Sequence, residues 1–267
     1  MHDLDREKLM HSPDLYAIWN AKPFFLDAAV KALEAEGDVY EYAFWNDAGS
    51  FRREHTYTLW PDPLTVDRIW KTATLDNGKK EDEFLFFPIA ALPPGNVRNW
   101  KEDMGPVDYD ISEGSFFGGS PKIISWWSQT YYAYHNYFLS RSLFVGKDQT
   151  LINALFLLFP SRILTVFHPD PRAPQFPNHI PFFDEGYLGA CGSEWFYYQY
   201  WLSGYEERKK MAEVWMKESK WAGWEWWRKR QECQLANGEN WENLVGRAFG
   251  KEWSPPERKL VVDASPH

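Results

Sequence analysis

An acidic residue follows a β-type apolar run near the start of the chain. The run Val39 to Trp45 leads directly into Asn46, Asp47, Ala48 and Gly49. A carboxylate at the end of a strand is a hard oxygen ligand for a divalent metal ion, and such an ion can neutralise a diphosphate. Asp47 is therefore a candidate metal ligand, with the Asn46 carbonyl oxygen beside it. The alternative is a local turn in which Asp47 bonds only backbone amides.

Two glycines form a second candidate. Gly118 and Gly119 precede Ser120 and Pro121, a pair that predicts the start of a helix. A loop without side chains lets a ligand approach the backbone, and free amides at a helix start favour anions or sugar hydroxyls. The pattern is equally typical of an ordinary capped loop.

A third candidate lies at the expected mouth of another helix. Asp148 and Gln149 follow Gly146 and Lys147, and Gln149 shares a helix face with Asn153. An acid in this place can orient an acceptor hydroxyl or brace a reacting sugar. Asp148 is also expected to cap the helix, a role that is compatible with the functional one.

His168 is a secondary candidate because it follows the apolar run Ile163 to Phe167 and is close to Asp170. An imidazole suits a softer divalent ion or a diphosphate oxygen. A histidine in a solvent-facing loop explains the same residues equally well.

The elements that would position these residues alternate between helix and strand. A short helix is expected from Ser12 to Trp19, and a second one from Pro23 to a stop at Gly37. The remaining patterns predict helices over 64–73, 121–140 and 149–158, strands over 39–45, 84–87 and 163–167, and a loop over 98–112. Such alternation predicts an α/β fold with a mostly parallel central sheet and helices on both faces. Ligands then bind at the carboxyl ends of the strands, where Asp47 and His168 would line one crevice.

The pattern changes after Pro171, which divides the chain into a domain over 1–192 and a helical, aromatic-rich extension over 193–267. Tryptophans alternate with both signs of charge over 206–234. This pattern favours a helix that packs its aromatic stripe on the main domain over one that lies on a membrane surface. The 16 tryptophans also offer flat faces on which sugar rings can stack, although large aromatic residues mostly fill cores.

Composition narrows the classes of partner. A formal net charge of −9 provides no basic field for nucleic acid. No run approaches the ~18 apolar residues of a membrane span, so a soluble chain without a transmembrane segment is expected. Cys191 and Cys233 fit neither a CxxC metal site nor a dense disulfide framework.

Taken in order, these segments resemble the HtrL/YibB-like (WlaTC/HtrL) glycosyltransferase family. The likeness spans about Tyr16 to Pro171, and the ordered set is more specific than any one of its members. The runs that carry it are Tyr16 to Pro23, Phe44 to Arg52, Gly114 to Ser120 and Val145 to Thr150.

The resemblance implies a GT-A fold, a nucleotide-sugar donor and a divalent metal ion, Mn²⁺ or Mg²⁺. It makes Asp47 the metal or diphosphate ligand, Gly118 and Gly119 the donor or acceptor sugar loop, and Asp148 with Gln149 the sugar-contacting or catalytic pair. His168 stays the secondary metal candidate that its own residues suggest. The residues it would place around the donor are Lys22, facing a phosphate, and Asn46, Gly49, Arg52, Gly118 and Gly119. Because Asp47 lacks the second acid of a DxD motif, Arg52, Arg53 or Lys147 would neutralise the leaving diphosphate instead.

A GT-A domain opens with a strand that holds the nucleotide base, and nothing apolar precedes Asp3. Either that strand lies upstream, which is the explanation we prefer, or the fold deviates from GT-A at this point. A segment upstream could also contain a membrane anchor. The protein would then act in the Golgi or secretory-pathway lumen, and without an anchor in the cytoplasm.

The predicted function is transfer of a hexose from a nucleotide sugar to a glycan or other hydroxyl acceptor. One alternative is a glycoside hydrolase that uses Glu185 and Glu194 as its two carboxylates. Another is a non-catalytic carbohydrate-binding protein on the same fold.

Overall fold

The structure is a computed structural model, and it describes residues 1–51, 57–167, 196–218, 233, 235–236 and 238–262. Arg52, Arg53, His168, Glu185 and Glu194 lie outside the described residues, as do four of the tryptophans expected in the C-terminal stripe, Trp221, Trp224, Trp226 and Trp227.

The first long helix, α1 (Pro13–Glu36), runs straight through Pro23. The expected end near Trp19 is therefore wrong, whereas the expected stop at Gly37 is confirmed by its left-handed backbone, with φ of 96°. An interior proline costs a helix about 3 kcal/mol. Packing offsets this cost, because α1 lies along α3 (Pro121–Ser140) and Tyr132 of α3 donates a hydrogen bond to the Asn20 carbonyl.

The central sheet has five strands in the order β1-β3-β2-β4-β5. They are β1 (Ala43–Asn46), β2 (Leu85–Phe86), β3 (Phe116–Gly119), β4 (Ile163–Val166) and β5 (Gly238–Asn240). Within the described residues β2 and β4 form the one parallel pair, and the other three pairs are antiparallel. The α/β class is confirmed, but the sheet is mixed rather than mostly parallel. The main reason is that the segment expected to be a glycine loop is strand β3, antiparallel to both of its neighbours.

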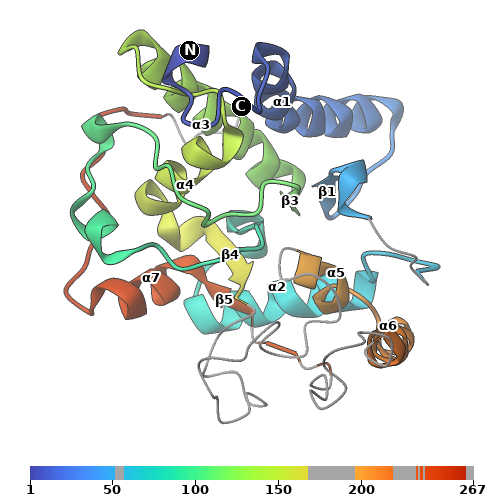
Figure 1. The fold of residues 1–267 in the computed structure, drawn as a ribbon. Coiled ribbons are helices and arrows are strands. Elements are labelled where there is room, and N and C mark those ends of the chain that lie inside the picture. Colours follow the sequence, from blue (N-terminus) through green and yellow to red (C-terminus); the bar gives the residue numbers. More distant parts are fainter. Residues whose placement is uncertain (52–56, 168–195, 219–232, 234, 237, 263–267) are drawn as a thin grey trace.

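Helices cover both faces of the sheet, as expected (Figure 1). One face packs against α1, α3 and α4 (Asp148–Leu158), and the other against α2 (Pro63–Asn77) and α5 (Tyr197–Trp201). Proline follows a capping residue at the start of both α2 and α3, where Asp62 accepts from Thr65 N and Ser120 accepts from Ile123 N. None of the described helices is both long enough and apolar enough to cross a membrane.

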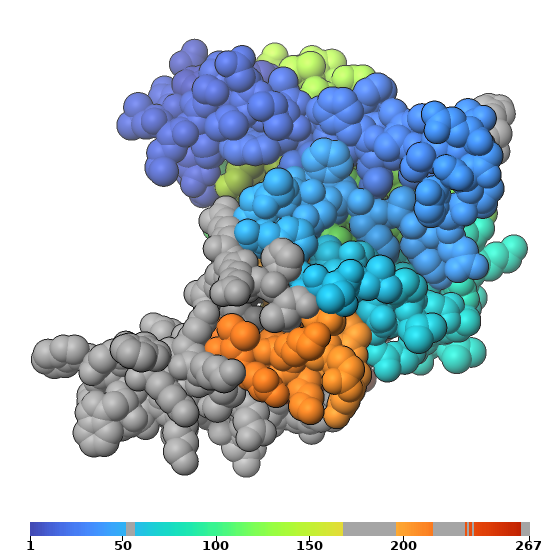
Figure 2. Space-filling view, turned by 90° about the vertical axis from the view of Figure 1, so that its right-hand side faces the viewer, coloured from blue at the N-terminus to red at the C-terminus, as the bar shows by residue number. Residues whose placement is uncertain are grey.

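The C-terminal part of the chain adds to both layers. After α6 (Tyr205–Glu218), β5 pairs with β4, and α7 (Trp241–Phe249) buries Trp241, Leu244 and Val245 in the same core as α3 and α4. Figure 2 shows another face of the molecule, with the blue N-terminal residues at the top, the orange α5–α6 segment at the bottom and light-blue residues between them.

Candidate active site

A buried lysine joins three distant segments of the chain. Lys22 of α1 places its Nζ 2.9 Å from Asp47 Oδ2 and 3.1 Å from Asp148 Oδ2, and it donates to the Gly114 carbonyl at 3.0 Å. Of the three N–H donors of the ammonium group, two make hydrogen bonds, to Asp47 and to the Gly114 carbonyl, and the contact with Asp148 is an ion pair. Lys22 is only 6% exposed and Asp148 only 8% exposed, which means that both charges are largely removed from water.

Asp47 lies just after β1 and is held from both sides. Its backbone N donates to the Ser115 carbonyl, and its Oδ1 accepts from Trp45 Nε1 at 2.5 Å. Its Oδ2 pairs with Lys22. Because its carboxylate bonds two side chains and caps no local amide, the interpretation as a purely local turn is wrong.

Asp148 begins α4, and Lys147 takes the N-cap position in its place. Asp148 Oδ1 accepts from the Gln149 backbone N at 2.8 Å. Oδ2 is buried and makes the ion pair with Lys22 but no well-aligned hydrogen bond. It therefore has capacity for one further donor. The Gln149 side chain is already used, because its Nε2 donates to the Ser112 carbonyl at 2.7 Å.

Burial and charge act against each other on these groups. Burial raises the pKa of Asp148 above its ordinary value although Lys22 opposes the rise. Burial alone would lower the pKa of Lys22, but its two carboxylate partners outweigh that effect and raise it. Burial also raises the pKa of nearby Glu113. The site therefore combines a firmly charged lysine with two carboxyls that protonate more readily than usual.

These residues line a cleft of about 480 Å³. The structure brings together Lys22, Asp47, Gly49, Asp148 and Gln149, all of which were expected at the site. The other lining residues are Trp19, Ser50, Asp110, Glu113, Gly114, Ser115, Lys147 and Phe196. Among these, the sequence singled out only Lys147, as a partner of the diphosphate. Five of them, Trp19, Ser50, Gly114, Ser115 and Lys147, do lie within the runs that carry the resemblance.

Gly118 and Gly119 lie elsewhere, inside β3 and fully surrounded by protein. A Cβ on Gly118 would lie 2.2 Å from the Ala43 carbonyl oxygen, and one on Gly119 would lie 2.8 Å from the Phe84 carbonyl oxygen. They are glycines because neighbouring backbone approaches so closely. The expected loop is therefore wrong, and neither glycine lines the cleft. Asn46 ends β1 and donates to the Asp47 carbonyl, and it does not line the cleft.

Asn20 is a positioning residue that the sequence did not reveal. Its Nδ2 donates to the carbonyls of Tyr16, Val145 and Gly146, and its Oδ1 accepts from Tyr131 Oη. It therefore joins α1, α3 and the segment before α4, and so fixes Lys22 relative to Asp148. The amide lies in the run from Tyr16 to Pro23, but nothing in its spacing indicates contacts so distant in sequence.

The arrangement around Asp47 does not fit a divalent metal ion. Both carboxylate oxygens are engaged, and the Lys22 ammonium lies between Asp47 and Asp148, where a bridging ion would have to lie. In the described part of the chain, the His, Cys, Asp and Glu side chains close enough to share an ion are Asp5, Glu7 and His11, outside this cleft.

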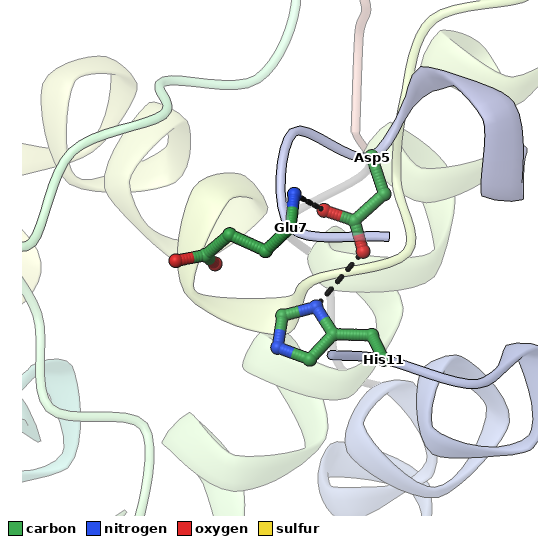
Figure 3. Close-up of side chains that lie close together, drawn as sticks. All are labelled: Asp5, Glu7 and His11. Carbon is green, nitrogen blue, oxygen red and sulfur yellow. Dashed lines mark hydrogen bonds and ion pairs between the residues drawn. The ribbon is translucent and has the colours of Figure 1, made fainter. Parts of the chain in front are cut away.

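That second group fastens the N-terminal segment rather than leaving ligands free (Figure 3). Asp5 is buried, and its carboxylate accepts from Glu7 N, His11 Nδ1 and Tyr16 Oη, so that these hydrogen bonds outweigh burial and lower its pKa. Glu7 in turn pairs with Lys147 at 3.2 Å. A metal ion would have to replace these hydrogen bonds.

Comparison of the chain with family models, curated proteins and solved structures finds no match.

Proposed function

We propose that this protein is a glycosyltransferase on a GT-A-like fold that moves a sugar from a nucleotide-sugar donor to a hydroxyl acceptor. The observation that carries the proposal is the Lys22 bridge. The residues that resemble donor-site motifs of such enzymes come from α1, the end of β1 and the start of α4, and their polar groups converge in one cleft.

In the proposed reaction, the acceptor oxygen forms a bond to the anomeric carbon while the bond to the diphosphate oxygen breaks. The electron pair and negative charge leave with the nucleotide, and the proton of the acceptor hydroxyl is released to solvent. Asp148 Oδ2 accepts a hydrogen bond from a hydroxyl of the sugar or acceptor, because it is the buried oxygen with spare capacity. Lys22 keeps Asp47 and Asp148 in fixed positions, which lowers the cost of ordering them during the reaction.

The cleft as formed is not basic enough to hold a diphosphate. Its lining contains four acids, Asp47, Asp110, Glu113 and Asp148, against two lysines, Lys22 and Lys147. Additional positive charge must accompany the donor, and we assign it to Arg52 or Arg53, which would act beside Lys147. A divalent ion brought by the nucleotide itself is the other source, and the experiment below distinguishes the two.

A carbohydrate-binding protein without catalysis is the second candidate. Trp19 and Phe196 both line the cleft and offer aromatic faces next to polar groups, a combination suited to a sugar ring. Such a protein would bind free glycans but not nucleoside diphosphates.

The deciding experiment is a thermal-shift screen of UDP, GDP and their sugars, with Mn²⁺ and with a chelator. A ligand at 100 times its dissociation constant stabilises the native state by about 2.7 kcal/mol, so a true donor should raise Tm clearly. A rise that needs Mn²⁺ would assign the missing charge to a metal ion, and a rise in chelator would assign it to arginine and lysine. If glycans alone raise Tm, the transferase proposal is wrong.

Asp148→Asn tests the chemistry directly. The substitution keeps the size of the side chain but removes its charge, so hydrolysis of the donor sugar nucleotide should fall by roughly 10²-fold or more. Because it also removes one partner of a buried ion pair, turnover is measured at a temperature at which circular dichroism shows the variant to be folded. Asp67→Asn is the matched control, because Asp67 pairs with Lys71 on the exposed face of α2. Equal turnover in wild type and Asp148→Asn would contradict the assigned role.

A further inference from the structure

A second, larger cavity of about 880 Å³ lies at the β5 edge of the sheet, opposite the edge formed by β1. Its wall includes one face of α2, where Arg68, Thr72 and Asp76 follow one another at intervals of four residues. Arg208 of α6 and Trp201 of α5 lie on the wall as well. The cavity shares no lining residue with the cleft around Lys22.

Arg68 contributes a guanidinium group without a protein partner. It is exposed on α2, and within the described residues it forms neither an ion pair nor a hydrogen bond. Lys71, one turn along the same helix, is by contrast paired with Asp67 at 2.7 Å. The five N–H donors of Arg68 are therefore available to a ligand.

Arg208 is anchored but only partly used. Its Nε donates to the Tyr200 carbonyl and its Nη2 to the Trp201 carbonyl, both at 3.1 Å. These bonds fix the plane of the guanidinium group at the end of α5. Since two of its five N–H donors are occupied, three remain for another acceptor.

The two guanidinium groups also repel each other. The pKa of Arg208 lies below its ordinary value, first because the group is partly buried and second because the positive charge of Arg68 disfavours a second positive charge nearby. The acids on the wall do not relieve this repulsion by pairing: Asp76 is exposed and forms no ion pair within the described residues, and Glu239 is bonded to Arg247. An anion placed between the two arginines would remove the repulsion and satisfy the free donors.

We propose that this cavity binds a small phosphate monoester, with Arg68 and Arg208 holding the phosphate. Phosphate presents several acceptor oxygens and two negative charges to two fork-shaped donors, and arginine is suited to that geometry. The cavity is larger than a phosphate ion, and Thr72 and Asn243 add polar groups beside Trp201 on its wall. A phosphorylated sugar matches this size and these polar groups, because its hydroxyls can bond Thr72 and Asn243.

The test is calorimetric titration of the full chain with inorganic phosphate and with a hexose phosphate, at constant ionic strength. We expect both to bind, the hexose phosphate more tightly. Arg68→Ala should weaken binding by about tenfold or more, because it removes charge-assisted hydrogen bonds. Arg68 is exposed and has no protein partner, so the variant should fold normally.

Two controls locate the binding. Lys71→Ala removes one positive charge from the same helix but not from the cavity, and Gln149→Ala alters the Lys22 cleft. Both should leave the affinity for phosphate unchanged. The proposal is overturned if wild type binds neither probe, if Lys71→Ala weakens binding as much as Arg68→Ala, or if Gln149→Ala abolishes it.

Discussion

Lys22 is the residue on which the candidate active site depends. Its ammonium group lies between two carboxylates, the buried one of Asp148 and the partly exposed one of Asp47, and compensates the charge of both. The residue types and order in the sequence were sufficient to predict that Lys22, Asp47, Asp148 and Gln149 belong to one site. They could not reveal that Lys22 bonds acids rather than facing a phosphate, because that depends on how α1 lies against β1 and α4.

Lys22→Met tests this arrangement through its dependence on pH. Leaving the buried Asp148 carboxylate and the partly exposed Asp47 carboxylate without their partner should lower the free energy of unfolding by about 3 to 5 kcal/mol near neutral pH. The pKa of Asp148, already raised by burial, will rise further without Lys22. An acid whose pKa is higher in the folded state than in the unfolded state stabilises the fold as the pH falls. Urea unfolding should therefore show a smaller deficit at about pH 5 than at about pH 8.

Lys31→Met is the matched control, since Lys31 pairs with Asp27 on the exposed face of the same helix. It should cost less than about 1 kcal/mol at either pH. A deficit for Lys22→Met that stays constant between the two pH values would contradict the assignment of Asp148 as the titrating group.

Among the elements, β3 shows how a local pattern can mislead. The glycines before Ser120 and Pro121 suggest a loop, and the capped helix that follows them is indeed present. The strand itself could not be predicted from that pattern. Its glycines are needed because the backbone of the neighbouring strands leaves no room for a Cβ, and those neighbours are distant in sequence. β5 was missed for a related reason: its three residues, Gly238, Glu239 and Asn240, lack any apolar alternation and pair only because β4 is next to them.

Gly118→Ala should therefore disrupt the sheet. The new methyl group would meet the Ala43 carbonyl oxygen at 2.2 Å and Phe44 Cα at 2.8 Å, and neither backbone atom can move without separating β1 from β3. We expect a loss of about 3 kcal/mol or more, measured by chemical unfolding. Gly95→Ala is the control, because its Cβ would meet nothing within 4 Å. Similar stability for the two variants would show that β1 and β3 are not paired as described.

At the scale of the whole molecule, the sheet separates two aromatic cores. Phe116 packs with Phe44 and Tyr198 on one face, and the next residue, Phe117, packs with Phe87 on the other. The α/β class and helices on both faces could be predicted from the alternation of patterns. Strand direction could not, because it depends on crossovers that no local run of residues specifies.

Because both cores rest on the same strands, they should unfold together. Phe116→Ala and Phe117→Ala should each cost about 3 to 5 kcal/mol, and unfolding followed by tryptophan fluorescence and by far-ultraviolet circular dichroism should coincide. Phe24→Ala, at a position that is 54% exposed, should cost much less. Separate transitions for the two cores would show that the sheet does not couple them.

The close approach of backbone at Gly118 and Gly119 also affects how an alignment of related chains should be interpreted. Selection will keep both positions as glycine wherever β1, β2 and β3 pair as they do here, whether or not the protein retains its activity. Conservation of these two glycines would therefore show that related chains share the fold. Conservation of the activity is to be judged from residues 22, 47 and 148, which should persist or change together.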